Sequence, residues 1–455
     1  MTAPRVFPIF IINMGIRIWL VAAYLLVFAF IQTLWLTPVA LAQPSAGGGA
    51  SAVPDFQPRV YLGIDTLAAN KFKGLVSEGG KQRRVGLITN PSGVNCRGRT
   101  TLEVMREGGV NLVALFAPEY GVYGEVLDDV YQKGNTVDQR SNLPVHFLVN
   151  EARKPTPEML KNIDVLVYDI QDIGCRAYTY IATLGLAMEA AGEAGIEFYV
   201  LDRPNPLGGN RIEGMPVNPR FTSNYGLWDI PYVYGLTCGE LANMIYKQHW
   251  IKKLPKQLVV VPMKGWYRDM TWEDTGLIWV PPSPHIPTPD TAYYFAITRA
   301  IGEAGPVNQG IGYTIPFGVV GGPQWNPFHL ADELNKLKMP GVYFRPIFYK
   351  PNYGPQQRVN LSGVQIHITD KQQINLCGTS AMMMEIIRTI PGSDLFVNPP
   401  GGELEFDRSV GGDELRTHFK RGGSAAELLQ IWEPGLQQFR VMRKPYLLYQ
   451  NSPQG

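Results

Sequence analysis

Cysteine and histidine are scarce in this chain, and neither is spaced for metal or redox chemistry. The 455 residues include four cysteines and six histidines. The sequence has no C-x-x-C pair and no H-x-x-x-H, so it gives no signal for a zinc site or another metal centre. Export would permit disulfides, but the simpler expectation is four buried thiols, at Cys96, Cys175, Cys238 and Cys377.

A charge excess and a nucleotide motif are missing as well. Lys and Arg number 41 against 39 Asp and Glu, which leaves a formal charge of +2 without a basic cluster. Nucleic acid is therefore not an expected partner. Neither G-x-G-x-x-G nor G-x-x-x-x-G-K-[ST] occurs. We therefore expect no dinucleotide and no nucleoside triphosphate.

The N-terminus carries a long apolar run over residues 18–36. Arg5 and Arg17 precede it, and an A-x-A cleavage signal follows at residues 40–42, as in a secretory signal peptide. We predict a signal peptide over 1–42, cleavage before Gln43, a flexible linker over 43–57, and a periplasmic or extracellular protein. Because the run approaches the length that spans a bilayer, an uncleaved membrane anchor is the alternative.

Apolar strand patterns and helical patterns alternate after residue 58. Strands are predicted at 84–89, 110–116, 165–168, 197–201 and 257–262, with helices at 100–107, 156–161, 181–194 and 236–248. This alternation predicts an α/β fold, a Rossmann-like and mostly parallel sheet, over residues 58–295. Shorter elements follow a Pro-rich stretch at 279–288, and they predict a second, smaller α+β domain over 296–455.

Polar residues directly follow four of the predicted strands. They are Asn90, Glu119, Asp169 with Asp172, and Asp202 with Arg203. Because parallel strands point the same way, these groups are expected to converge at one edge of the sheet. Convergent carboxylates without a nucleotide cradle indicate acid–base chemistry on a small polar substrate, sugars included.

The densest polar stretch is 164–180, where Gln171, Arg176, Tyr178 and Tyr180 follow the central strand. A purely structural role is the alternative for these groups, since buried ion pairs imitate active sites. In that case Asp169 and Arg176 would form a buried ion pair, and Asp202 and Arg203 together would hold a loop in place.

Twelve short stretches together resemble the exo-acting β-N-acetylmuramidases of bacterial cell-wall recycling. They are residues 87–93, 118–121, 164–180, 201–206, 235–241, 261–263, 265–266, 268–270, 279–288, 363–370, 432–436 and 445–449. The resemblance covers nearly the whole exported chain. It implies a Rossmann-like catalytic domain with an auxiliary C-terminal domain. It also implies removal of N-acetylmuramic acid from the non-reducing end of peptidoglycan fragments without a cofactor.

The resemblance and the usual two-group logic of glycosidases assign roles to the polar residues. Glu119 is the expected general acid/base. Its partner, as nucleophile or as stabiliser of the oxocarbenium ion, would be Tyr180, Tyr178, Asp169 or Asp172. The residues expected to hold the sugar are Asn90, Gln171, Arg176, Tyr178, Asp202, Arg203 and Asn205.

The chain departs from the family pattern at seven positions. Neutral residues stand where the family has two histidines, four arginines and an acid, namely Tyr120, Tyr123, Val233, Tyr234, Gln309, Ile311 and Ile315. Arg is the natural partner of the lactyl carboxylate of muramic acid. The replacements therefore predict weak or absent cleavage of muramic acid glycosides. The alternative function is a non-catalytic or re-purposed member that binds cell-wall glycan or hydrolyses an uncharged sugar. The test is whether Gln309 and Ile311 line the crevice beside Glu119.

Overall fold

The structure is a computed structural model, and it describes residues 57–453 apart from 79, 126–135 and 150–152. The predicted signal peptide or anchor and nearly all of the linker lie outside the described residues. Within the described part, no helix has both the length and the apolar character needed to cross a bilayer. The chain from Gln57 onward forms one compact unit.

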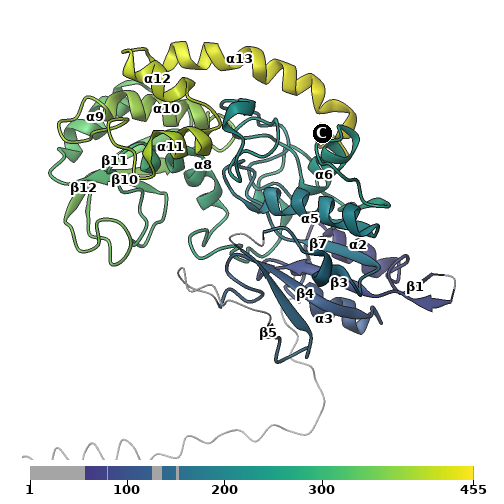
Figure 1. The fold of residues 1–455 in the computed structure, drawn as a ribbon. Coiled ribbons are helices and arrows are strands. Elements are labelled where there is room, and N and C mark those ends of the chain that lie inside the picture. Colours follow the sequence, from purple (N-terminus) through teal and green to yellow (C-terminus); the bar gives the residue numbers. More distant parts are fainter. Residues whose placement is uncertain (1–56, 79, 126–135, 150–152, 454–455) are drawn as a thin grey trace, which may run out of the picture. The chain divides into compact units, whose positions relative to one another are not determined.

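A seven-stranded sheet occupies the first half of this unit (Figure 1). The strand order is β5-β6-β4-β3-β7-β8-β9, and every neighbouring pair is parallel except β5–β6. The strands are β3 Val85–Thr89, β4 Leu112–Pro118, β5 Thr136–Val137, β6 Pro144–Leu148, β7 Val165–Asp169, β8 Glu197–Leu201 and β9 Leu258–Val261. Numbered along the chain, the parallel strands run 3-2-1-4-5-6, the Rossmann order, so strand order reverses between β3 and β7. The predicted Rossmann-like sheet is confirmed.

Helices cover both faces of this sheet because successive strand residues point to opposite sides. Val165 packs into the core beneath α2 (Gly63–Ala69) and α3 (Thr101–Glu107), whereas Leu166 packs beneath α5 (Tyr180–Ala194) and α6 (Cys238–Lys247). Burial on both faces explains why the strands read as continuous apolar runs. The short elements of this half are β1 Ser77–Glu78, β2 Lys81–Gln82, α4 Pro157–Leu160, η2 Pro219–Phe221 and α7 Trp272–Thr275.

A small antiparallel sheet, in the order β10-β12-β11, forms the centre of the second half. Its strands are β10 Val319–Gly322, β11 Val342–Tyr349 and β12 Leu361–Ile368. The surrounding helices are α8 Asp290–Ala304, α9 Pro327–Lys336, α10 Leu376–Ile387, α11 Gly402–Val410, α12 Glu414–Lys420, α13 Ala425–Met442 and η3 Lys444–Tyr446. The predicted α+β character is confirmed. Residue 296, where the second domain was expected to begin, lies inside α8, and the division into domains stays a prediction.

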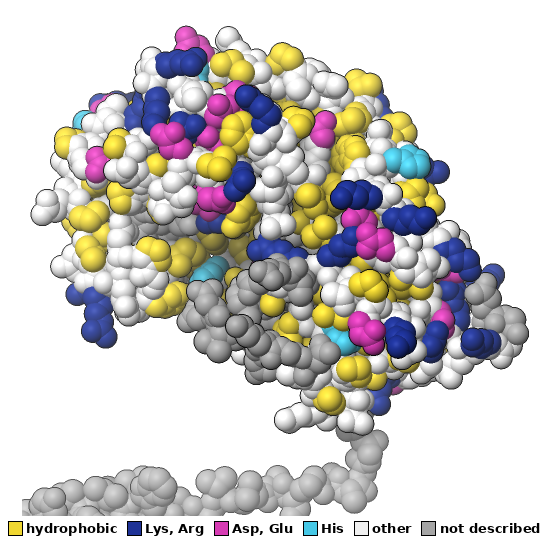
Figure 2. Space-filling model, in the orientation of Figure 1, with side chains coloured by type: hydrophobic (Ala, Val, Ile, Leu, Met, Phe, Trp, Pro, Cys, Tyr) yellow, Lys and Arg dark blue, Asp and Glu magenta, His cyan; other side chains and the backbone are white. Residues whose placement is uncertain are grey.

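Acidic and basic side chains are mixed over the visible face rather than gathered by sign (Figure 2). This agrees with the balanced charge of the sequence. The four cysteines are buried and free, so the expectation of buried thiols is confirmed. Among the residues the structure describes, no group of three or more His, Cys, Asp or Glu side chains could hold a metal ion.

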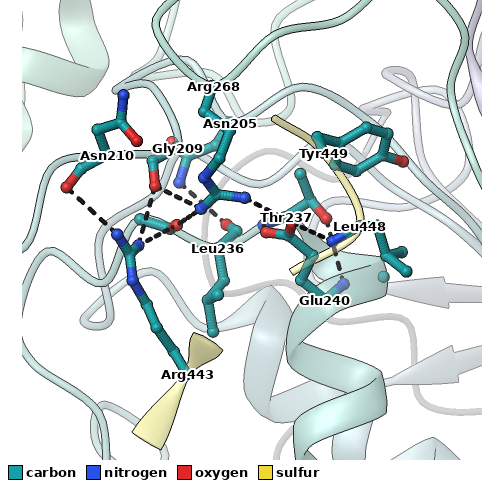
Figure 3. A network of polar contacts seen from close by, with 12 residues as sticks. Asn205, Gly209, Asn210, Leu236, Thr237, Glu240, Arg268, Arg443, Leu448 and Tyr449 are labelled. Atoms are coloured by element: carbon teal, nitrogen blue, oxygen red, sulfur yellow. Dashed lines mark hydrogen bonds and ion pairs between the residues drawn. The ribbon is translucent and has the colours of Figure 1, made fainter. Parts of the chain in front are cut away.

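A buried polar network fastens the C-terminal segment to the carboxyl edge of the first sheet (Figure 3). Arg268 forms an ion pair with Glu240 at 2.5 Å, and both side chains are almost fully buried. Arg268 and Arg443 each donate to the Gly235 carbonyl at 2.6 Å. Beside them, the Tyr449 hydroxyl donates to Asp202 Oδ2 at 2.6 Å. Arg443 and Tyr449 therefore fasten the C-terminal segment to buried groups of the first half.

Candidate active site

A cavity of about 350 Å³ opens at the carboxyl end of β4, and Glu119 lines it. Its volume is in the range of small-molecule sites. Leu148 at the end of β6 and the residues just before α5 form one side. The other side belongs to the second half of the chain, and its residues include Phe295, Arg299, Gln309, Ile311 and Phe317. Both halves are therefore needed to enclose the site.

The backbone at Glu119 turns its side chain out of the strand direction. Glu119 follows Pro118, the last residue of β4, and has φ = 49°. Residues other than glycine are uncommon in this left-handed region, and holding one there costs about 1–3 kcal/mol. Strain of this kind is concentrated at functional sites, where the surrounding structure maintains it. The conformation is consistent with Glu119 serving the cavity.

The surroundings of the Glu119 carboxyl group favour its protonated form. Burial raises the pKa of Glu119, while a hydrogen bond from the Thr179 hydroxyl and the nearby charge of Arg153 lower it. The net shift is upward. A carboxyl group with a raised pKa keeps its proton closer to neutral pH, which suits a general acid.

Tyr178 lines the cavity, and Tyr180, which does not line it, packs against the Tyr178 ring. Their rings meet edge to face with centroids 5.0 Å apart. Burial raises the pKa of both hydroxyl groups well above the usual range, so both tyrosines are neutral. The Tyr180 hydroxyl donates to the Pro282 carbonyl at 2.8 Å. No described group completes a hydrogen bond with the Tyr178 hydroxyl, although Ser283 is near enough to affect its pKa.

The crevice at the strand-order reversal is filled by a structural ion pair. Arg203 donates to Asp169 at 2.5 and 2.9 Å, and both side chains are buried. The Thr101 hydroxyl at the start of α3 donates to the same carboxylate. Only a void of about 10 Å³ remains beside Arg203. The predicted pairing of Asp169 with Arg176 is therefore wrong, because the cation that meets Asp169 is Arg203.

Two further acids predicted for the site are enclosed away from the cavity. Asp172 accepts hydrogen bonds from the Tyr234 hydroxyl and, at 2.6 Å, from the Gly174 amide. Asp202 accepts from the Gly239 amide at 2.8 Å as well as from Tyr449. Burial raises the pKa of each carboxyl group to about 6. Neither lines the cavity of Glu119.

Three predicted sugar ligands use their side-chain amides to hold loops. Asn90, Gln171 and Asn205 donate to the carbonyls of Pro282, Pro204 and Leu236 at 2.9, 2.7 and 3.0 Å. None of the three lines the cavity. These three side chains hold the loops around the site in place, and they do not reach the cavity.

Arg176 links the two halves of the chain from a fully buried position. It donates to the Val410 carbonyl at 2.6 Å and to the Tyr225 carbonyl at 3.2 Å. Its guanidinium also lies 5.6 Å from the centre of the Tyr232 ring. Burial lowers the pKa of Arg176 to about 10. It stays cationic at neutral pH but does not line the cavity.

Sequence reasoning missed several residues that line the cavity. They are Arg153, Thr179, Tyr225, Ser283, His285 and Arg299. Arg299 lies on a helix that was not predicted, and Arg153 follows β6, a strand that was not predicted, so neither came after a predicted strand end. Thr179 lies inside the singled-out stretch 164–180, and Ser283 and His285 lie inside the Pro-rich stretch 279–288. Those two stretches were therefore the only available signal.

The altered family positions divide between the cavity and other places. Tyr120, Gln309 and Ile311 line the cavity, as the sequence test required for a changed site. The side-chain amide of Gln309 donates to the Thr298 carbonyl at 2.8 Å, in the amide orientation that satisfies both of its ends. The others do not line the cavity, namely Tyr123, Val233, Tyr234 and Ile315. Arg153 and Arg299 also line it, so the cavity contains two cations although family arginines are replaced.

Two family models match the chain. One, described as Exo-beta-N-acetylmuramidase NamZ, N-terminal, matches residues 85–290, and its C-terminal counterpart matches residues 294–449. Among curated proteins, the chain is similar to Peptidoglycan beta-N-acetylmuramidase NamZ of Bacillus subtilis (strain 168). The two are 40% identical over 409 residues, which is 88% of this chain and 95% of that protein.

Two crystal structures of DUF1343 family proteins from Bacteroides fragilis have a similar fold. The first is 43% identical, covers 87% of this chain and 100% of its own, and has a TM-score of 0.80. The second is 26% identical, covers 86% of this chain and 99% of its own, and has a TM-score of 0.65. The likeness extends over both halves of the chain.

Proposed function

This chain belongs to the exo-β-N-acetylmuramidase NamZ family of glycoside hydrolases, and from that premise we propose that it releases terminal N-acetylmuramic acid from peptidoglycan fragments. The observation that carries the proposal is the cavity beside β4. It contains one carboxyl group with a raised pKa and two arginines, and it is large enough for an amino sugar.

Glu119 acts as the proton donor in this proposal. In its protonated form it gives a proton to the glycosidic oxygen as the bond to the sugar carbon C1 breaks. A water molecule supplies the hydroxyl group that C1 gains, and its remaining proton returns to the Glu119 carboxylate. Among the described lining residues, Glu119 is the only carboxylate. The roles sketched for Asp169 and Asp172 therefore have no geometric support, since both are bonded away from the cavity.

Tyr178 is the proposed partner of Glu119, and this is supported by its place in the lining of the same cavity. Its raised pKa keeps the hydroxyl group protonated, so it supports a role as hydrogen-bond donor rather than as a phenolate nucleophile. The ring also offers a flat surface on which an uncharged sugar face can pack. Tyr180 holds this ring in place.

The test is turnover of the 4-nitrophenyl β-glycoside of N-acetylmuramic acid by the purified protein. Glu119→Gln removes the acidic proton and should lower kcat by about a hundred- to ten-thousandfold. Glu158→Gln is the matched control, because Glu158 is exposed on α4, and it should keep full activity. Full activity in Glu119→Gln would place the acid elsewhere. Absence of turnover by the unaltered protein, with intact glycan binding, would favour the non-catalytic alternative.

We further propose that the protein is exported, since residues 1–42 have the layout of a secretory signal peptide. Export would place the enzyme with peptidoglycan, outside the cytoplasmic membrane. N-terminal sequencing of the native protein should return Gln43 as the first residue. Residues upstream of Gln43 would instead support the membrane-anchor alternative.

A further inference from the structure

The Arg299 side chain stands where two cavities meet. It lines the cavity of Glu119 and also a neighbouring cavity of about 800 Å³. Phe295, Arg299 and Glu303 follow at intervals of four along α8, so they share one face of that helix. Phe295 lines only the first cavity and Glu303 only the second. Arg299 is thus the cation at the junction between the reacting site and the space beyond it.

Arg299 is held in position while most of its donors stay available. Its one ion pair within the described residues is with Glu303, one helical turn away, and the two side chains are 24% and 22% exposed. A guanidinium carries five N–H donors in a planar fork, and Glu303 occupies only part of it. Glu303 therefore orients the group, and the remaining donors can bind a ligand carboxylate in the bidentate way that suits Arg.

The position of Arg299 also suits the shape of the proposed substrate. N-acetylmuramic acid carries its lactyl carboxylate on O3, two ring carbons away from C1, where Glu119 acts. A cation for that carboxylate should therefore stand apart from the acid. Glu119 and Arg153 line only the first cavity, whereas Arg299 also lines the second cavity beyond it. Arg153 is thus placed at the reacting end and Arg299 away from it.

We infer that Arg299 is the specificity-determining residue of this site, whose guanidinium binds the lactyl carboxylate of the substrate. The inference rests on the proposed function and deepens it. It also accounts for Ile311, which lines the same two cavities as Arg299. At residue 311, where the family resemblance would put an arginine, this chain has an apolar side chain. In this chain the cation is instead Arg299, which lies on α8.

The test compares two aryl glycosides that differ only in the lactyl group, those of N-acetylmuramic acid and N-acetylglucosamine. Arg299→Gln should raise KM for the muramic acid substrate about ten- to a hundredfold, the value of one charge-assisted pair. Its kcat and its turnover of the N-acetylglucosamine substrate should change little. Because both substrates report on the same sample, the ratio of their kcat/KM values does not depend on the folded fraction. An unchanged ratio would overturn the inference.

A relocated cation provides a second variant. Arg299→Gln combined with Ile311→Arg moves the guanidinium to the neighbouring wall and should restore part of the lost preference for muramic acid. If Arg299→Gln fails to fold, Arg299→Lys keeps the charge without the planar fork and should give a smaller loss. A muramic acid preference that is equal in Arg299→Lys and the unaltered protein, with no gain from Ile311→Arg, would contradict bidentate binding by Arg299.

Binding measurements separate this inference from the proposed function. Titration calorimetry with free N-acetylmuramic acid, its methyl amide and N-acetylglucosamine needs no catalysis. The unaltered protein should bind the free acid more tightly than the methyl amide, which keeps the size but loses the charge, and Arg299→Gln should bind the two equally. This pattern without turnover would leave Arg299 as the carboxylate ligand and remove the hydrolase proposal. Turnover of the muramic acid glycoside without discrimination between the free acid and its methyl amide would leave the hydrolase proposal intact and remove Arg299 as the carboxylate ligand.

Discussion

Replacing Asp172 with Asn should make the protein more stable at neutral pH and leave it almost unchanged near pH 4. Burial raises the pKa of Asp172 from 3.8 to about 6, so the fold disfavours the charged form. At low pH the carboxyl group is protonated in both the folded and the unfolded state and costs nothing. As the pH rises, the unfolded chain releases its proton first, and stability falls until the folded carboxyl group also ionises.

The expected magnitude follows from the size of the pKa shift. A rise from 3.8 to about 6 is worth about 3 kcal/mol at pH 7.5, at about 1.4 kcal/mol for each pKa unit. At pH 4 less than about 1 kcal/mol of this cost is present, because the unfolded carboxyl group is still partly protonated. Asn keeps an oxygen for the Tyr234 hydroxyl and the Gly174 amide, and it carries no charge. The NH2 group of the Asn side chain takes the place of Asp172 Oδ1, which has no hydrogen bond within the described chain.

Asp202 is the matched control because burial raises its pKa to about 6 as well. Its two oxygens accept four hydrogen bonds, from the Arg203 and Gly239 amides and from the Thr237 and Tyr449 hydroxyls. In Asp202→Asn, the side-chain NH2 group would face either the two backbone amides or the two hydroxyl groups, where an acceptor is needed. Asp202→Asn should therefore destabilise the fold by about 1–3 kcal/mol at pH 4, and this deficit should shrink as the pH rises, because the variant no longer carries the cost of ionising Asp202.

The assay is urea unfolding followed by tryptophan fluorescence at several pH values between 4 and 7.5. The free energy of unfolding of Asp172→Asn should exceed that of the unaltered protein by a margin that grows with pH. Parallel curves for the two proteins would refute the reasoning, because they would show that Asp172 titrates alike in the folded and unfolded states. Activity should persist in Asp172→Asn, since Asp172 does not line the cavity.

Three further outcomes are expected. Tyr449→Phe should lower stability by about 1–3 kcal/mol, because the hydroxyl donates to Asp202 and accepts from the Met263 amide at 3.0 Å. Tyr446→Phe, which loses only an exposed contact with Gln248, should change the unfolding midpoint little. EDTA should leave activity intact, as the described residues form no metal cluster, and recovery of a lost activity by added zinc or calcium would contradict this. A reducing agent should leave the thermal midpoint unchanged, because the four cysteines are free and buried, and a clear drop would reveal a disulfide.

The sheet could be predicted from the sequence because its signal is local. Strands β3, β7 and β8 are buried along all five residues and are mostly apolar, which is the pattern that burial on both faces requires. Helix α6 begins with a Thr–Glu capping box that can be read directly from the chain. Helix α8 was missed. The predicted domain boundary fell inside it, because it follows a Pro-rich stretch and is apolar on most sides.

The site could be predicted only at Glu119 and in the loop that carries Tyr178. The rule that ligands gather at carboxyl ends of parallel strands identified the edge at which the cavity of Glu119 opens. It could not show which groups at that edge already have partners. Asp169, Asp172 and Asp202 follow strands as Glu119 does, yet each is enclosed by hydrogen bonds from residues distant in the chain.

The sequence by itself determined the alternation of strands and helices in the first half, the class of each half and the family, since these depend on local apolar periodicity and on short motifs. Only the tertiary structure decided which polar groups face open space. That outcome depends on pairings such as Arg203 with Asp169, and on Arg299 reaching the cavity of Glu119 from α8, 180 residues further along the chain. The free energy of burying a charge depends on such distant partners, and no local pattern records them.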